Sequence, residues 1–278
     1  MIVYIVSGKG GTGKTTIAVS LALSLSNVQF LDCDVEEPNA HIFLKPELYK
    51  QEKCYIPIPE IDESKCDFCG LCSRVCAYNA LAVITPEKDR KGHVLVFDQL
   101  CHGCGACSFL CPRKAITEVN KEIGVIESGH AEEIEFAHGR LNIGAAMAPP
   151  IIRKLKRAIN PNKTVVIDAP PGTSCPVVTT LTGSDFAILV TEPTPFGLND
   201  LILMVEVIRK LKIPFGIIIN RADVGDDKVR KYCNEQKIPI LLEIPFKREI
   251  ALAYSKGDAL VTALPEYKKI FSDIFLNI

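Results

Sequence analysis

The chain has 278 residues, of which 47% are hydrophobic and 23% charged, as in globular proteins with one large domain or two ordinary ones. Its 32 basic and 33 acidic residues give a formal net charge of −1, which disfavours nucleic-acid binding, since nucleic-acid binders usually carry a basic excess. No apolar run approaches the roughly 18–20 residues of a membrane-spanning helix, so no membrane span is expected.

Cysteine usage indicates the expected compartment. Of 12 cysteines, eight fall in two tight clusters, and the scattered four are Cys33, Cys54, Cys175 and Cys233. The N-terminus shows no pattern of a secretory signal, so the clusters favour metal binding over disulfides. We therefore expect a cytoplasmic protein in a reducing environment.

Short apolar runs alternate with helical patterns outside the cysteine-rich region. Strands are predicted at 2–7, 28–34, 164–170, 186–192, 215–221 and 238–245. Helices are predicted at about 14–26, 149–159, 197–212, 226–237 and 248–256. Continuously apolar strands that alternate with helices indicate an α/β fold with a doubly wound, mostly parallel sheet. The C-terminal "YKKIFSDIFLNI" (267–278) has helical apolar spacing and is expected to pack on the core, with an amphipathic membrane anchor as the alternative.

The first predicted strand leads into a phosphate-binding motif. "GKGGTGKT" fits G-x-x-x-x-G-K-[ST] between a strand and a helix, the context that makes this motif specific. Backbone N–H groups at the helix N-terminus favour a phosphate, Lys14 is expected to reach the β- and γ-phosphates, and Thr15 to bind Mg²⁺. The loop residues expected at the nucleotide are Gly8, Lys9, Gly10, Gly11, Thr12, Gly13, Lys14, Thr15 and Thr16.

Lys9 is an additional lysine within this loop. The "KGGxGKT" form resembles the deviant phosphate loop of the MinD/Mrp and nitrogenase iron-protein superfamily. The resemblance implies a P-loop ATPase and a nucleotide-dependent homodimer, in which Lys9 stabilises transition-state charge on the partner's nucleotide as an arginine finger would. A solvated surface lysine is the alternative.

Two further stretches are similar to the switches of that superfamily. "DCDVEEPN" (32–39) resembles the first switch and makes Asp34 the candidate that orients the attacking water near Mg²⁺. "VVIDAPPG" (165–172) resembles the second and makes Asp168 the Walker-B-type carboxylate near Mg²⁺. Asp168 also ends an apolar strand, where a carboxylate faces the ligand crevice of such a fold. Either aspartate could instead cap a loop.

Base recognition is expected from the C-terminal half. "NRAD" (220–223) resembles a base-recognition element, in which Asn220 pairs with adenine, while Asp223 leaves guanine open. "IPFKRE" (244–249), with Pro245 and Phe246, resembles the loop that closes over the base. The superfamily is mostly adenine-specific, so ATP is the expected nucleotide and GTP the alternative.

The clustered cysteines form a repeat. "CDFCGLCSRVC" (66–76) and "CHGCGACSFLC" (101–111) are offset by 35 residues, and each reads C-x₂-C-x₂-C-x₃-C. This spacing is typical of bacterial two-cluster ferredoxins, in which the fourth cysteine of each copy ligates the other cluster. One 4Fe–4S cluster is therefore expected on Cys66, Cys69, Cys72 and Cys111, and the other on Cys101, Cys104, Cys107 and Cys76. Structural zinc is the alternative.

The repeat also sets the expected domains. We expect an inserted ferredoxin-like domain at 60–117 within a discontinuous P-loop ATPase domain at 1–59 and 118–278. The nitrogenase iron protein holds a cluster across its dimer with a cysteine placed like Cys175, but the second such cysteine has no counterpart in 138–146. The four scattered cysteines are therefore expected to be buried structural thiols.

Three functions remain open. We favour an ATPase that couples nucleotide state to electron transfer through two 4Fe–4S clusters, toward an unidentified redox partner. The first alternative is an Mrp-type carrier that delivers clusters to an apo iron–sulfur protein, although such carriers use a sparse, labile site. The second is a Min-type spatial regulator, in which the clusters would have no purpose.

Overall fold

The computed structural model describes residues 1–88 and 90–278 and divides into two compact units. The first comprises Met1–Glu52, Ile126–Arg140 and Ile151–Ile278, and the second Lys53–Val125 and Leu141–Pro150. The predicted insert, 60–117, falls within the second unit apart from residue 89, which lies outside the described residues. Its identity as a ferredoxin domain stays a prediction.

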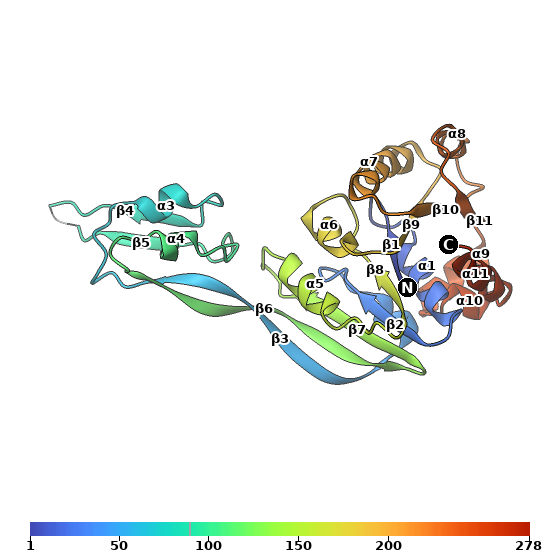
Figure 1. The fold of residues 1–278 in the computed structure, drawn as a ribbon, viewed down its shortest axis with the longest axis horizontal. Helices are drawn as coiled ribbons and strands as arrows, with labels where there is room; N and C mark the ends of the chain where they lie inside the picture. The colour runs from blue at the N-terminus through green and yellow to red at the C-terminus, as the bar shows by residue number, and fades with distance from the viewer. Residues whose placement is uncertain (89) are drawn as a thin grey trace. The chain divides into compact units, whose positions relative to one another are not determined.

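The centre of the first unit is a parallel sheet with the strand order β11-β10-β9-β1-β8-β2-β7 (Figure 1). These strands are β1 (Ile2–Val6), β2 (Val28–Asp32), β7 (Ile134–Leu141), β8 (Thr164–Asp168), β9 (Phe186–Thr191), β10 (Phe215–Asn220) and β11 (Ile240–Ile244). The parallel sheet is thereby confirmed, and β1, β8 and β2 form its buried centre because their side chains meet apolar neighbours on both faces. Of the seven strands, the sequence missed β7.

Two long strands extend the sheet beyond β7. They are β3 (Glu47–Ile61) and β6 (Ile116–Ala131), and a two-residue turn at 132–133 joins β6 to β7. The sequence missed both strands because their many exposed positions interrupt the apolar runs expected of a parallel core. The chain passes from the first unit to the second within β3 and returns within β6.

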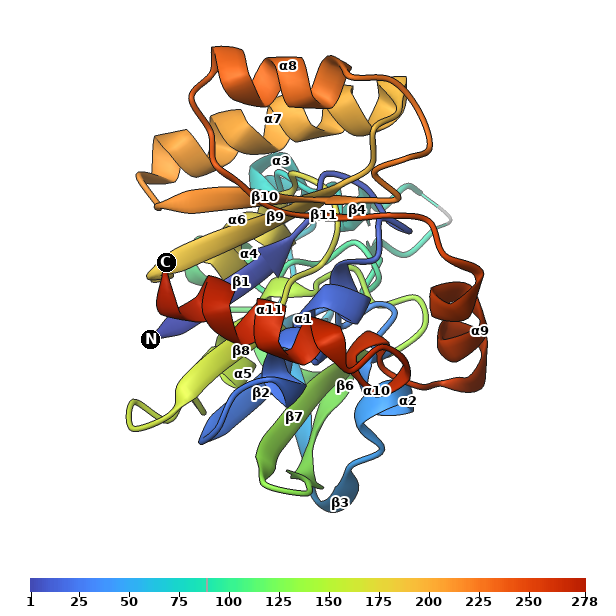
Figure 2. The same cartoon turned by 90° about the vertical axis from the view of Figure 1, so that its right-hand side faces the viewer.

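Helices cover both faces of the sheet, as a doubly wound fold requires. They are α1 (Lys14–Leu23), α2 (Ala40–Leu44), α5 (Pro149–Lys156), α6 (Cys175–Leu181), α7 (Pro195–Leu211), α8 (Lys228–Glu235), α9 (Arg248–Lys256), α10 (Leu260–Ala263) and α11 (Glu266–Leu276). Helices α1, α10 and α11 pack together on one face, and Figure 2 shows them in front of the strands. Phe271 of α11 is fully buried in that core, so the packing role of the C-terminal helix is confirmed.

No helix in the described part of the chain is both long and apolar enough to cross a bilayer.

The second unit contains a structural repeat. It has the antiparallel pair β4 (Leu81–Ile84) and β5 (His93–Val96), with the short helices α3 (Leu71–Val75) and α4 (Ala106–Phe109). Left-handed backbone recurs at positions 35 residues apart, in the pairs Phe68 and Gly103, Gly70 and Gly105, and Asn79 and Lys114. The two cysteine motifs therefore share one backbone path.

Candidate functional site

The phosphate loop follows β1 and opens directly into α1. Gly13 caps α1 with a φ of 89°, and Gly11 has a φ of 79°, a left-handed conformation that favours glycine. A Cβ atom on Gly13 would lie 2.4 Å from Asn220 Nδ2. Glycine is therefore required at position 13 both by the backbone and by the neighbouring side chain.

A pocket of about 430 Å³ opens beside this loop. Ten of the predicted nucleotide residues line it: Gly10, Gly11, Gly13, Lys14, Thr15, Thr16, Asp34, Asn220, Pro245 and Phe246. Five others do not: Gly8, Lys9, Thr12, Asp168 and Asp223. The fold thus brings the loop, the first-switch stretch and the two C-terminal stretches to one pocket.

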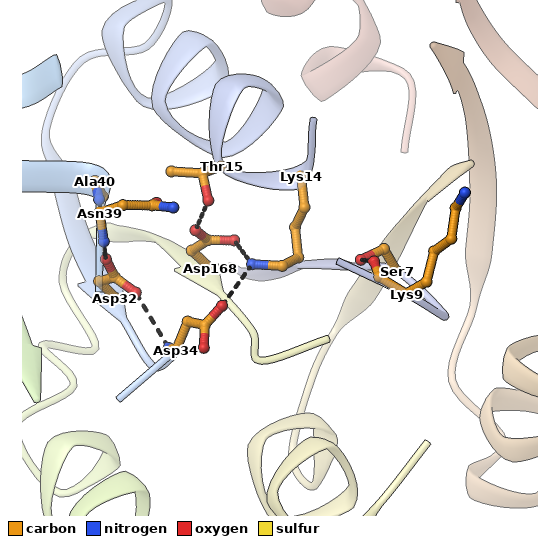
Figure 3. Close-up of polar contacts among 9 residues, drawn as sticks. All are labelled: Ser7, Lys9, Lys14, Thr15, Asp32, Asp34, Asn39, Ala40 and Asp168. Carbon is orange, nitrogen blue, oxygen red and sulfur yellow. Dashed lines mark hydrogen bonds and ion pairs between the residues drawn. The ribbon is translucent and has the colours of Figure 1, made fainter. Parts of the chain in front are cut away.

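Asp168 binds the two side chains of the phosphate motif (Figure 3). Its carboxylate accepts a hydrogen bond of 2.7 Å from Lys14 Nζ and one of 2.6 Å from Thr15 Oγ1. Asp34 Oδ2 lies 3.6 Å from the same Lys14 Nζ. Burial lowers the pKa of Lys14, but Asp168 and Asp34 outweigh it, so the net pKa is raised and the ammonium stays charged. Thr15 and Asp168 together offer the hard oxygen ligands that Mg²⁺ prefers.

Asp32, which was not predicted, holds the first-switch stretch in place. It pairs in register with Asp168, at the carboxyl ends of β2 and β8. Its Oδ1 accepts a 3.1 Å bond from Asp34 N, and its Oδ2 accepts bonds of 3.1 and 3.0 Å from the N–H groups of Asn39 and Ala40. One buried carboxylate therefore fixes the backbone on both sides of the loop that carries Asp34.

Burial shapes the charge of these aspartates. Burial, together with the neighbouring Asp168 and against the opposing effect of Lys14, raises the pKa of Asp32 to about 8. Burial also raises the pKa of Asp34 to about 6, against the opposing effect of Lys14. The carboxylates of Asp168 and Asp34 around the single Lys14 ammonium leave an excess of negative charge, which suits a divalent cation.

The Lys9 side chain points away from Lys14 and Asp168 (Figure 3) and is paired elsewhere. Its Nζ lies 3.5 Å from Glu192 Oε2, and the other oxygen of Glu192 lies 2.8 Å from Arg221 Nη1. The side chain of Glu192 is only 9% exposed, whereas that of Lys9 is 32% exposed. The additional lysine thus forms an ion pair with a buried carboxylate of its own chain.

The two predicted base-recognition residues contact the protein itself. Asn220 Nδ2 donates a 2.9 Å bond to the Thr12 carbonyl, which ties the end of β10 to the phosphate loop. Asp223 Oδ1 accepts a 2.6 Å bond from Phe246 N and so anchors the loop predicted to close over the base. Arg221 lies over the Phe246 ring, 6.0 Å from its centroid. Asn220 lines the pocket. Asp223 does not line it, and it bonds to the backbone of Phe246, which does.

In the second unit, each predicted set of four cysteines lines its own small pocket. Site A is lined by Cys66, Cys69, Cys72 and Cys111. Site B is lined by Cys76, Cys101, Cys104 and Cys107. Among residues 1–88 and 90–278, no three or more His, Cys, Asp or Glu side chains are placed to hold one metal ion. Cluster binding at these sites therefore stays a prediction.

The donor sets nevertheless fit the group that the motif implies. An iron–sulfur cluster is held by four thiolates, often with N–H donors to the sulfurs, and is larger than a single ion. At site A, Phe68 N and Ala115 N donate to Cys66 Sγ and Cys111 Sγ, both at 3.4 Å. At site B, the matching donors are Gly103 N to Cys101 Sγ at 3.4 Å and Ala80 N to Cys76 Sγ at 3.3 Å.

The scattered cysteines correct one expectation. Cys33, Cys54 and Cys233 are buried, as expected, but Cys175 is exposed. Cys175 begins α6, where the chain leaves the loop that follows β8, and this placement keeps its thiol outside the apolar core. The expectation that Cys175 is a buried structural thiol is therefore wrong.

Comparison with known proteins places the chain in a family. Residues 3–261 match the family described as the CobQ/CobB/MinD/ParA nucleotide binding domain. The chain belongs to this family. The uncharacterized protein MJ0579 of Methanocaldococcus jannaschii is 32% identical over 268 residues, which cover 94% of this chain and 91% of that protein.

Two further comparisons are narrower in what they show. An iron-sulfur cluster carrier protein of Aquifex aeolicus is 32% identical over 120 residues, only 37% of this chain and 32% of that protein. The septum site-determining protein MinD of Pyrococcus horikoshii OT3, solved with Mg-ADP, is 18% identical with a TM-score of 0.58, covering 98% of this chain and 93% of its own. The latter shows a shared CobQ/CobB/MinD/ParA fold.

Sequence reasoning missed three residues at this CobQ/CobB/MinD/ParA-type site: Asp32, Glu192 and Arg221. Asp32 and Glu192 both stand at or just after the end of a parallel strand, the same signal that selected Asp168. Arg221 lies inside the quoted "NRAD", but its pairing with Glu192 joins two strands and has no local signal.

Proposed function

We propose that this chain is an ATP-hydrolysing iron–sulfur protein that couples its nucleotide state to electron transfer through two 4Fe–4S clusters. One observation supports this proposal most strongly. A chain of the CobQ/CobB/MinD/ParA family has two pockets, each lined by the four cysteines of a crossed ferredoxin motif. Nucleotide binding supplies the energy and the clusters supply the redox chemistry.

The nucleotide half of the proposal rests on the pocket beside the phosphate loop. Lys14 would bind the β- and γ-phosphates, and Thr15 with Asp168 would hold Mg²⁺. Asp34, 3.6 Å from Lys14, would orient the attacking water. The relative solved with Mg-ADP supports an adenine nucleotide with magnesium.

The proposed homodimer rests on Lys9. This lysine does not line its own pocket, and the "KGGxGKT" form resembles loops in which the extra lysine acts on a partner's nucleotide. We therefore propose that ATP draws two copies together and that Lys9 stabilises transition-state charge across the dimer.

The redox half rests on sites A and B. Each cluster, when bound, would accept or release a single electron. The thiols of each set would hold it, and the paired N–H donors would stabilise charge on the sulfurs. A redox partner would receive the electron. Which protein serves as this partner depends on the surface of the second unit to which it binds.

A second candidate function has one observation in its favour. The partial relative from Aquifex aeolicus is named as an iron-sulfur cluster carrier. Delivery of clusters to an apo-protein would need labile ligation. Eight cysteines in ferredoxin spacing, each set with two N–H···S bonds, support permanent clusters instead.

The deciding experiment uses anaerobically reconstituted full-length protein. We expect its iron to stay with the chain in the presence of an apo-ferredoxin acceptor, and the midpoint potential of its clusters to change when Mg-ATP is added. Lys14→Ala is the matched control, which should keep the clusters and lose the nucleotide effect. ATP-dependent transfer of the clusters to the acceptor within minutes would instead support the carrier function.

A further inference from the structure

The second unit offers an internal comparison, because sites A and B are built from repeated segments. Most residues that line site A have a counterpart 35 positions away in the chain that lines site B. The N–H···S bonds map as well: Phe68 onto Gly103, and Ala115 onto Ala80. Backbone contributions to the two sites are therefore matched, and any difference between them must come from side chains.

The charged side chains differ between the two sites, and they make the surroundings of site A more positive than those of site B. Arg74 follows the third cysteine of site A, and its Nη1 donates a 3.0 Å bond to the carbonyl of Cys69. The counterpart of Arg74 in the second repeat is Phe109, an uncharged ring that is 88% exposed. A cation is thus bonded to a ligand residue of site A, and the same position beside site B has none.

Two other pairs of positions 35 residues apart also differ in charge between the sites, and in the same direction. Arg113 lines site A, paired at 2.9 Å with Asp67, and its counterpart at site B is the uncharged Tyr78. Glu118 lines site B, and its counterpart at site A is Val83. Asp67 offsets Arg113, so among the Asp, Glu, Lys and Arg side chains at these positions Arg74 gives site A one excess positive charge and Glu118 gives site B one negative charge.

These charges change the ease of reduction. An added electron makes a cluster more negative, so a nearby cation stabilises the reduced form and a nearby carboxylate destabilises it. Burial acts in the same direction, because Cys101 of site B is buried while its counterpart Cys66 is partly exposed to water. Both effects favour reduction at site A over site B.

We propose that the cluster at site A has the higher reduction potential, so that electrons pass within the chain from site B to site A. In this step one electron leaves the site B cluster, which is oxidised, and enters the site A cluster, which is reduced. No proton moves and no other reactant is needed. The inference rests on the proposed function, since it requires clusters at both sites.

The test is a redox titration of the anaerobically reconstituted full-length protein, with dithionite as reductant and electron paramagnetic resonance as the readout. Two midpoint potentials are expected. Arg74→Phe should lower the higher one alone, and Phe109→Arg or Glu118→Gln should raise the lower one alone. Arg74 and Phe109 are exposed, so these exchanges leave the packing intact.

Iron and sulfide content separates the possible failures. A chain that binds no clusters would overturn the proposed function, and this inference with it. Full cluster content with midpoint potentials that do not respond to Arg74→Phe, or a Glu118→Gln variant that shifts the higher potential, would overturn the electron order alone. Convergence of the two potentials in the Arg74→Phe/Phe109→Arg double variant would support it.

Discussion

Lys9 Nζ lies 3.5 Å from the carboxylate of Glu192 in the same chain, although the resemblance predicts a role for Lys9 in a partner's site. Arg221 contacts the same carboxylate at 2.8 Å. Glu192 would therefore remain neutralised if Lys9 left. The ion pair can act as a latch that holds Lys9 back until a dimer forms.

We predict that Glu192→Gln lowers the protein concentration needed for half-maximal ATPase activity. A partly exposed ion pair is worth about 0.2–1 kcal/mol, and a dimer opens two of them, so the shift can reach about thirtyfold. The measurement is ATPase rate against protein concentration. Lys9→Ala is the control and should abolish turnover at every concentration while nucleotide binding is nearly kept. An unchanged or weaker concentration dependence in Glu192→Gln would rule the latch out.

The pH dependence of stability should reveal the buried Asp32. Its pKa of about 8 in the folded state lies above the value of roughly 3.9 in an unfolded chain, so the folded state binds the extra proton between these values. Stability of the nucleotide-free protein should therefore rise as the pH falls from 8 to about 6.5, by at most about 1.4 kcal/mol per pH unit from this group.

Thermal melts across this pH range test the prediction. Asp32→Asn removes the titrating charge with little change of shape and should flatten the profile. Mg-ATP should flatten it too, because a cation offsets the carboxylates. A wild-type profile that coincides with that of Asp32→Asn would contradict the assignment.

Alanine substitutions at Gly13 and Gly10 of the phosphate loop should differ in their effect on stability. Gly13→Ala places a side chain in left-handed backbone, which costs about 1–2 kcal/mol, and sets its Cβ 2.4 Å from Asn220 Nδ2. At Gly10 a Cβ would meet nothing within 4 Å. We expect Gly13→Ala to lower the unfolding free energy by more than the strain alone and Gly10→Ala to leave it nearly unchanged, as measured by urea unfolding.

Pairs of cysteine variants test the crossed ligand sets. Cys69→Ala with Cys111→Ala damages site A only and should remove about half of the reconstituted iron. Cys69→Ala with Cys76→Ala damages both sites and should remove nearly all of it. Iron analysis after reconstitution distinguishes the two, with Cys175→Ser as the control that keeps full content. The reverse pattern, with nearly complete loss in Cys69→Ala/Cys111→Ala and about half in Cys69→Ala/Cys76→Ala, would show that the sets are not crossed.

Much of the nucleotide site could be predicted because its signals are local. The phosphate loop is a contiguous motif, and Asp168 ends an apolar strand, so spacing and periodicity were enough. The contacts made by these residues were not predictable, because Lys14 and Asp168 are 154 positions apart in the chain. β3 and β6 were missed because their runs of exposed positions do not resemble the buried strands of the core.

Local spacing was enough to predict the phosphate motif, six of the parallel core strands and the two cysteine repeats, since each depends on near neighbours in the chain. The folded chain alone reveals that Asp32 holds the first-switch stretch, that Glu192 pairs with Lys9, and that Arg74 donates to the carbonyl of a ligand residue of site A. These contacts form only when the chain has folded. Burial, charge and hydrogen bonding at such contacts depend on the folded path of the backbone, which local spacing does not fix.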